Sequence, residues 1–158
     1  MPHYLIDGYN VIHAIPELKS VWVQHPEGHA ARGHLLEMAV AILSSPNNQV
    51  SLIFDGKGDD LAMEHSRDDP SLAVIYTSKS QSADGCIEQM LDRSQHPEEL
   101  IVVTGDNLIC EAARARKAMD VSPGEFYDEV TSRRRLLDQI LMKKRKYSDE
   151  DFGNRIPL

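Results

Sequence analysis

The amino-acid sequence predicts an α/β fold, with an open and mainly parallel sheet that is flanked by helices on both faces. Short apolar runs rich in Val, Ile and Leu alternate along the chain with longer segments of helical character. The apolar runs contain few polar residues, which is typical of strands buried on both faces of a parallel sheet. Strands that alternate with helices imply right-handed crossovers within one sheet. The length of 158 residues fits a single domain.

Four apolar runs are expected to be strands, and a weaker fifth strand is expected later in the chain. They cover residues 4–6, 50–54, 72–76, 100–103 and, for the weaker one, 118–121. The first and second runs end at Asp-Gly and the fourth ends at Thr-Gly-Asp, and these residue types favour turns. Three of the strands should therefore end close to an aspartate.

Four helices are expected between and after these strands, at residues 29–44, 83–94, 107–117 and 123–147. Pro46 prevents the first helix from continuing, and Pro123 suits the first turn of the last one. The sequence shows no internal repeat and no linker. We therefore expect one domain over residues 1–147, followed by a flexible C-terminal tail at residues 148–158.

Composition narrows the class of protein. The net charge of −8 argues against indiscriminate nucleic-acid binding, because contact with phosphate depends on cations. Residues 133–146, however, hold seven Lys or Arg and one acid, so this segment could steer a polyanion or could simply be a solvated helix face. No apolar run approaches the roughly 18 residues of a membrane span. With no signal-peptide pattern at the start, we expect a cytoplasmic protein whose Cys86 and Cys110 are free thiols.

Four aspartates are predicted to meet at one edge of the sheet. Asp7, Asp55 and Asp106 each follow a strand, and the carboxyl ends of parallel strands lie along one edge, where ligands bind. Asp84 lies in the first turn of the helix after the third strand, and Glu88 follows one turn later. Taken singly, each aspartate also suits a turn or a helix cap.

Together, the aspartates favour a metal site. Like charges at close range raise one another's pKa or recruit a cation, and a hard divalent ion with oxygen ligands relieves the repulsion. Carboxylates without Cys or paired His indicate Mg²⁺ or Mn²⁺ rather than Zn²⁺. Either one ion, or two ions about 3.5–4 Å apart, could then support phosphodiester hydrolysis.

Four sequence motifs resemble those of the NYN/YacP-like family, a bacterial branch of the PIN-like nucleases. They read LIDGYNVI, IFDG, SADGCIE and VTGDN, and they occupy residues 5–12, 53–56, 82–88 and 103–107. Their order and spacing match the family from about Tyr4 to Glu129, and the first motif is the most specific. Gly85 and Gly105 depart from the pattern, since larger or hydroxyl-bearing residues are expected there.

This resemblance implies a PIN-like fold and an Mg²⁺- or Mn²⁺-dependent endoribonuclease that acts on RNA, including single-stranded mRNA engaged with the ribosome. It further implies that Asp7, Asp84 and Asp106 are catalytic metal ligands and that Asp55 is a fourth ligand or a supporting acid. Three further side chains are expected to assist: Asn10 by orienting Asp7 or touching phosphate, Thr104 by supporting Asp106, and Glu88 as a helper.

RNA contacts are expected from residues in the loops and helices that border the predicted edge, namely Lys57, Lys79 and Arg32. Tyr9 could stack on a base of single-stranded RNA, or it could be a half-buried core residue. The main alternative function, motivated by Gly85 and Gly105, is a non-catalytic module that binds RNA or the ribosome. A phosphatase or receiver domain is disfavoured, because the first strand lacks the D-x-D or acid pair that such domains use.

Overall fold

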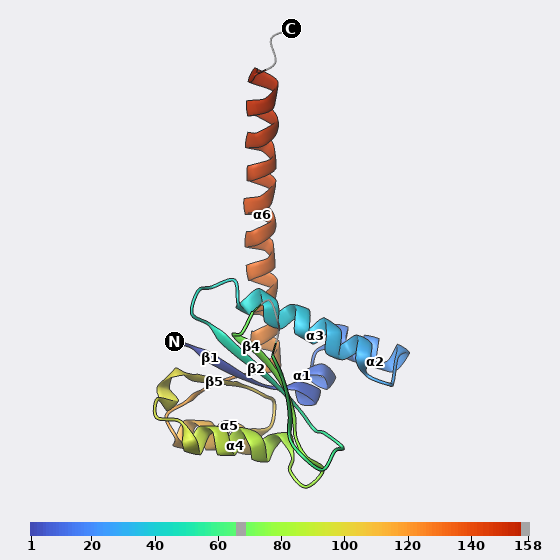
Figure 1. Ribbon diagram of the computed structural model, residues 1–158, viewed down its shortest axis with the longest axis vertical. Coiled ribbons are helices and arrows are strands. Elements are labelled where there is room, and N and C mark those ends of the chain that lie inside the picture. The colour runs from blue at the N-terminus through green and yellow to red at the C-terminus, as the bar shows by residue number, and fades with distance from the viewer. Residues whose placement is uncertain (66–68, 156–158) are drawn as a thin grey trace.

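The computed structural model describes residues 1–65 and 69–155, and it describes side chains up to residue 146. Its centre is a six-stranded sheet with the order β3-β4-β2-β1-β5-β6 (Figure 1). The strands are β1 (His3–Asp7), β2 (Gln49–Phe54), β3 (Ala62–His65), β4 (Leu72–Tyr76), β5 (Leu100–Val103) and β6 (Met119–Val121). All neighbours pair in parallel except β3, which runs antiparallel to β4 at one edge. The predicted α/β class with a mainly parallel sheet is confirmed.

Six α-helices surround the sheet: α1 (Gly8–Ala14), α2 (Pro16–Gln24), α3 (His29–Ile42), α4 (Ala83–Arg93), α5 (Asn107–Ala115) and α6 (Pro123–Arg155). A short 3-10 helix, η1 (Pro97–Glu99), precedes β5. Helices α1, α3 and the base of α6 pack on one face, and α4 and α5 pack on the other, as Figure 1 shows. The predicted helical layers on both faces are thus present.

Alternate residues of the central strands β1 and β2 contribute to two separate cores. In β1, Tyr4 and Ile6 point into the core beneath α1 and α3, whereas Leu5 points into the core beneath α4 and α5. The same alternation places Leu52 in the first core and Ile53 in the second. Successive side chains of a strand point to opposite faces, so a strand buried on both faces needs an unbroken apolar run.

Four elements were not predicted from the sequence, namely α1, α2, β3 and the short η1. Helices α1 and α2 fill the segment before α3, where Ile15 ends the first helix and Pro16 opens the second. Strand β3 reads Ala-Met-Glu-His, is exposed throughout and pairs only with β4, so it carries no burial pattern that would reveal it. Helix α6 extends to Arg155, past the end expected near Tyr147. The proposed boundary between residues 147 and 148 stays a prediction, and residues 156–158 lie outside the described part.

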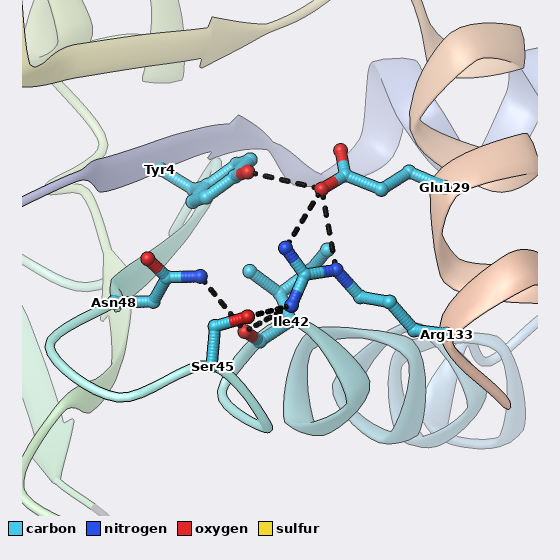
Figure 2. A network of polar contacts seen from close by, with 6 residues as sticks. All are labelled: Tyr4, Ile42, Ser45, Asn48, Glu129 and Arg133. Atoms are coloured by element: carbon cyan, nitrogen blue, oxygen red, sulfur yellow. Dashed lines mark hydrogen bonds and ion pairs between the residues drawn. The ribbon is translucent and has the colours of Figure 1, made fainter. Parts of the chain in front are cut away.

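A polar network fixes the base of α6 to the body of the protein (Figure 2). The Arg133 guanidinium donates hydrogen bonds to the Glu129 carboxylate at 3.0 Å, to the Ser45 hydroxyl and to the carbonyl oxygen of Ile42 at 3.3 Å. The Tyr4 hydroxyl donates to the same Glu129 carboxylate at 3.3 Å. One cation of the basic segment is therefore structural.

Beyond this network, α6 projects away from the sheet, and the side chains of residues 134–146 are exposed. The remaining cations of the basic segment thus lie on an exposed helix surface, which is compatible with both interpretations of this segment. Of the helices in the described part of the chain, none has the length and apolar composition needed to cross a bilayer.

Candidate active site

The site is built where the strand order reverses. The chain places β2 and β4 on one side of β1, and β5 and β6 on the other. Because β2, β1 and β5 are parallel, their carboxyl ends open onto one edge at this switch point. Asp7 is the last residue of β1, Asp55 follows β2, and Asp106 is the N-cap of α5 after β5.

The structure brings the four predicted aspartates to one open cleft of about 500 Å³, and we call it the acidic cleft. It is lined by Asp7, Asp55, Asp84 and Asp106, together with Tyr9, Asn10, His13 and Ala14. Asp84 enters from the first turn of α4, where the Ser82 hydroxyl caps the helix by accepting from the amide of Gly85 at 3.1 Å. Asp7 and Asp106, which are 99 positions apart in the chain, thus line the same cleft, as their places at the strand ends predict.

Asp7 is the most constrained of the four acids. Its side chain is only 5% exposed, and its Oδ2 accepts a hydrogen bond from the Thr104 hydroxyl at 3.1 Å. Burial and, after it, the negative charges of Asp84 and Asp55 raise the pKa of Asp7 to about 7, although the Thr104 hydrogen bond opposes this rise. Ionised Asp7 therefore needs a compensating positive charge.

The pKa of Asp84 is also raised. Burial is the largest cause that raises the pKa of Asp84, followed by the negative charge of Asp106, while a hydrogen bond with Asp7 opposes the rise. The charge of Glu88, one turn along α4, adds to it from an exposed position outside the lining of the acidic cleft. The acids thus meet in the arrangement that favours a cation.

Asp55 and Asp106 also have structural tasks. Asp55 Oδ1 accepts a hydrogen bond from the amide of Ala83 at 2.7 Å, which fixes the start of α4 and with it the neighbouring Asp84. Asp106 Oδ1 accepts from the amide of Leu108 at 2.9 Å and so caps α5. The cap and ligand interpretations of these aspartates are compatible, because each carboxylate has a second oxygen.

Thr104 and Asn10 hold the loop between β5 and α5. The Thr104 hydroxyl donates to Asp7 and accepts from the amide of Asp106 at 3.1 Å, so it supports both acids. The Asn10 side-chain oxygen accepts from the amide of Gly105 at 2.7 Å and so holds this loop, while its expected contact with Asp7 or phosphate stays a prediction. A Cβ at Gly105 would lie 3.3 Å from that oxygen, and the absence of a side chain thus permits the close approach.

The three predicted RNA-contacting cations are placed differently. Arg32 and Lys57 line a second cleft of about 870 Å³, which shares Tyr9, His13 and Asp55 with the acidic cleft. Lys79 lies outside the linings of both clefts and forms an ion pair with Asp59 at 2.7 Å.

Three residues that line the second cleft were not singled out from the sequence, namely His13, Trp22 and Tyr76. Its aromatic walls are Tyr9, His13, Trp22 and Tyr76, and we call it the aromatic cleft. Tyr9 is half-buried and its ring centroid lies 4.9 Å from that of Phe54 in the core, so it is a packed residue that also faces a cleft. His13 belongs to α1 and Trp22 to α2. These two residues could have been predicted beside Tyr9 only if both helices had been recognised in the sequence.

The donor chemistry of the acidic cleft fits a hard divalent cation, since all four candidate ligands are carboxylates. Within the described part of the chain, no three His, Cys, Asp or Glu side chains are already close enough to hold a metal ion. A metal ion held by Asp7, Asp84 and Asp106 would therefore require these carboxylates to lie closer together than they do here.

Comparison with known proteins adds the family. The family model described as the YacP-like NYN domain matches residues 4–157. An uncharacterized protein YacP of Bacillus subtilis (strain 168) is 28% identical over 158 residues, which cover 98% of this chain and 88% of that protein.

Two solved structures have the same fold. One is a crystal structure of a tryptophan-to-leucine variant of Rae1 (YacP) from Bacillus subtilis, with a TM-score of 0.76 and 26% identity over 92% of this chain and 85% of that chain. The other is a crystal structure of Rae1 (YacP) from the same organism, with a TM-score of 0.70 and 27% identity over 98% of this chain and 86% of that chain.

Proposed function

Because the chain belongs to the YacP-like NYN domain family, whose members carry a PIN-like nuclease domain, we propose that it is a metal-dependent endoribonuclease. Its reaction would be hydrolysis of RNA phosphodiester bonds, with Mg²⁺ or Mn²⁺ as the cofactor. The substrate class that we propose is single-stranded mRNA in the cytoplasm, including mRNA associated with the ribosome.

One observation carries the proposal: four carboxylates from four separate segments line the same cleft at the carboxyl edge of the sheet. Holding like charges close together, with Asp7 buried among them, destabilises a fold, and such an arrangement is typical of a functional site. The raised pKa values of Asp7 and Asp84 express this cost.

The roles of the residues follow from their contacts. Asp7, Asp84 and Asp106 would hold the metal, whose chemistry is to polarise the phosphate and to make a bound water more acidic. Asp55 positions Asp84 through the amide of Ala83, and Thr104 holds Asp7 and the Asp106 loop in register.

The charge of the substrate must also be balanced. Four carboxylates repel an RNA backbone, whereas Arg32 and Lys57 in the adjoining aromatic cleft offer positive charge beside them. The exposed cations at residues 134–146 of α6 add a wider positive field, which would raise the rate of encounter with RNA.

The test is a cleavage assay on a single-stranded RNA with Mg²⁺, with Mn²⁺ and with EDTA. We expect EDTA to abolish cleavage and Asp84→Asn to slow it by roughly 100-fold or more, equivalent to about 2.7 kcal/mol of transition-state stabilisation. Asp128→Asn, an exposed residue of α6, is the matched control and should cleave at the parental rate. Equal cleavage by the parent and a well-folded Asp84→Asn would refute the mechanism.

A second candidate function is a non-catalytic module that binds RNA or the ribosome. The spacing of the acids favours it, since no three His, Cys, Asp or Glu side chains of the described residues are grouped closely enough to hold a metal ion. This function predicts RNA binding or co-sedimentation with ribosomes, with no cleavage of any RNA in either Mg²⁺ or Mn²⁺.

A further inference from the structure

The aromatic cleft is a recess with a composition unlike that of the acidic cleft beside it. Its volume of about 870 Å³ lies within the roughly 300–1,000 Å³ range of small-molecule sites. Three of its aromatic side chains, Tyr9, Trp22 and Tyr76, are half-buried, so part of each ring remains accessible. The aromatic cleft therefore offers flat apolar surface next to the carboxylates of the acidic cleft.

The aromatic walls are held in fixed positions by one another and by the core. Trp22 packs edge-on against Tyr9, with centroids 5.6 Å apart, and against His13 at 4.9 Å. Tyr76 is stacked on the buried ring of Phe54 at 5.7 Å. These contacts fix the rings before any ligand arrives, which lowers the entropic cost of stacking a ligand on them.

Arg32 brings a positive charge into this recess. Its guanidinium donates a hydrogen bond to the Tyr9 hydroxyl at 3.2 Å and contacts His29 Nδ1 at 2.9 Å. Gly28, with a φ of +87°, caps α3 beside it, and a Cβ there would lie 2.8 Å from both Arg32 and Trp22. The glycine thus allows the tryptophan ring and the guanidinium to approach the same point.

Charge balance around Arg32 and Lys57 is incomplete. In residues 1–65 and 69–146, neither side chain has a carboxylate within ion-pair distance, whereas Lys79 nearby is paired with Asp59. Glu27 and Asp55 are the acids of the lining. Two cations without ion-pair partners beside accessible aromatic rings suit a ligand that has both an anionic group and a flat ring.

We propose that the aromatic cleft binds one unpaired nucleobase of the RNA, adjacent to the phosphate that the acidic cleft engages, with Arg32 and Lys57 contacting the flanking backbone. The two clefts share Tyr9, His13 and Asp55, so neighbouring groups of one strand can occupy both. This inference rests on the proposed function, because it takes RNA as the substrate.

The geometry selects single-stranded substrate. A base in a duplex is stacked and paired, so it reaches a recess only after it is extruded, whereas an unpaired base can stack on an aromatic ring directly. Stacking on aromatic side chains tolerates different bases, and the cleft therefore favours single strands over duplexes.

Trp22 provides the test, because it is the only tryptophan of the chain. Its fluorescence is titrated in EDTA, where no metal-dependent cleavage interferes, with AMP, with UMP, with ribose 5-phosphate and with a short single-stranded RNA. We expect saturable quenching by the RNA and by the two nucleotides, and none by ribose 5-phosphate at the same concentration. Equal responses to AMP and ribose 5-phosphate would show a phosphate site only and would overturn the proposal.

Tyr76→Leu tests the stacking surface while leaving the Trp22 reporter in place. We expect it to weaken RNA binding by about 10-fold, within the range of a lost base–aromatic stack. In the cleavage assay it should raise KM by a similar factor with little change in kcat. Tyr127→Leu, another half-buried tyrosine but one outside both clefts, is the matched control and should bind RNA like the parent.

The outcomes separate this proposal from the nuclease proposal. RNA that is cleaved by the parent without any Trp22 response would overturn the base-binding cleft and leave the nuclease standing. A Trp22 response that Tyr76→Leu weakens, with no cleavage under any metal, would support the cleft and refute the nuclease. The comparison of AMP with ribose 5-phosphate uses the parent chain alone and decides the question even if Tyr76→Leu does not fold.

Discussion

The hydroxyl of Thr104 donates a hydrogen bond to the Asp7 carboxylate across 3.1 Å, although 97 positions separate the two residues in the chain. Both side chains are buried, and the same hydroxyl accepts from the amide of Asp106. One small side chain thus connects the end of β1 to the loop that carries another acid of the cleft.

Thr104→Val should show how much depends on this hydroxyl. The substitution keeps the shape but leaves Asp7 without its donor and the Asp106 amide without its acceptor, so we expect unfolding to require about 1–3 kcal/mol less free energy. RNA cleavage should fall as well, because two candidate ligands lose their support. Urea unfolding and the cleavage assay measure both effects.

Two further variants make this result specific. Thr104→Ser restores the hydroxyl and should recover most of the stability and the activity. Thr131→Val removes a hydroxyl that donates only to the carbonyl of Tyr127 within α6, at 2.9 Å, and should cost less than about 1 kcal/mol. If Thr104→Val and Thr131→Val lost comparable unfolding free energy, the hydrogen bond to Asp7 would stabilise the fold no more than an ordinary hydroxyl contact within a helix.

Asp7→Asn should stabilise the metal-free protein at neutral and higher pH. Burial, followed by the negative charges of Asp84 and Asp55, raises the pKa of Asp7 from 3.8 to about 7, so the folded protein retains a proton that the unfolded chain has already released. The stability lost to this group therefore grows as the pH rises through that interval, and it is complete above it. In EDTA at pH 8 we expect Asp7→Asn to exceed the parent by about 1–3 kcal/mol.

This difference should shrink as the pH falls towards 4, where Asp7 is neutral in the parent as well. Added Mn²⁺ should raise the melting temperature of the parent more than that of Asp7→Asn, because the cation relieves the same repulsion. A variant that is less stable than the parent at every pH would contradict the interpretation of Asp7 as an electrostatic liability.

The convergence of the acids could be predicted because it depends on a general property of parallel sheets. Asp7, Asp55 and Asp106 each follow an apolar run, and parallel pairing of β2, β1 and β5 is enough to bring their ends to one edge. Asp84 needed only the additional expectation that α4 begins near that edge. No detailed side-chain geometry was required for these predictions.

The aromatic cleft could not be predicted in this way. His13 and Trp22 meet only because α1 and α2 fold back beside each other, and the short segment that contains both helices gave no recognised pattern. The partner of Asn10 was equally hidden, because the Gly105 amide reaches it through a loop conformation rather than through strand register. Contacts between short helices and between loops depend on packing that strand order and register do not determine.

Arg133→Met should weaken the attachment of α6 to the body of the protein. The methionine keeps much of the apolar stem but removes the donors to Glu129, Ser45 and the carbonyl of Ile42, so we expect a loss of about 1–3 kcal/mol in unfolding free energy. Arg134→Met is the matched control, since its side chain is exposed, and it should change stability by no more than about 0.5 kcal/mol. Equal effects of the two substitutions would show that the network in Figure 2 does not hold the helix.

Lys57 and Lys79 should contribute unequally to RNA binding, although the sequence places both beside the acidic edge. Lys57 lines the aromatic cleft, whereas the Lys79 ammonium lies 2.7 Å from Asp59 and is already neutralised by it. A cation that contacts phosphate releases about one counterion on binding, so Lys57→Gln should weaken binding and lower the slope of log K against log salt by about 1. Lys79→Gln should leave the slope nearly unchanged, because the cation it removes was paired within the protein.

Fluorescence anisotropy of a labelled single-stranded RNA in EDTA, repeated over a range of salt concentrations, measures both slopes. A larger change for Lys79→Gln than for Lys57→Gln would place the RNA backbone along the loop of Asp59 and away from the aromatic cleft.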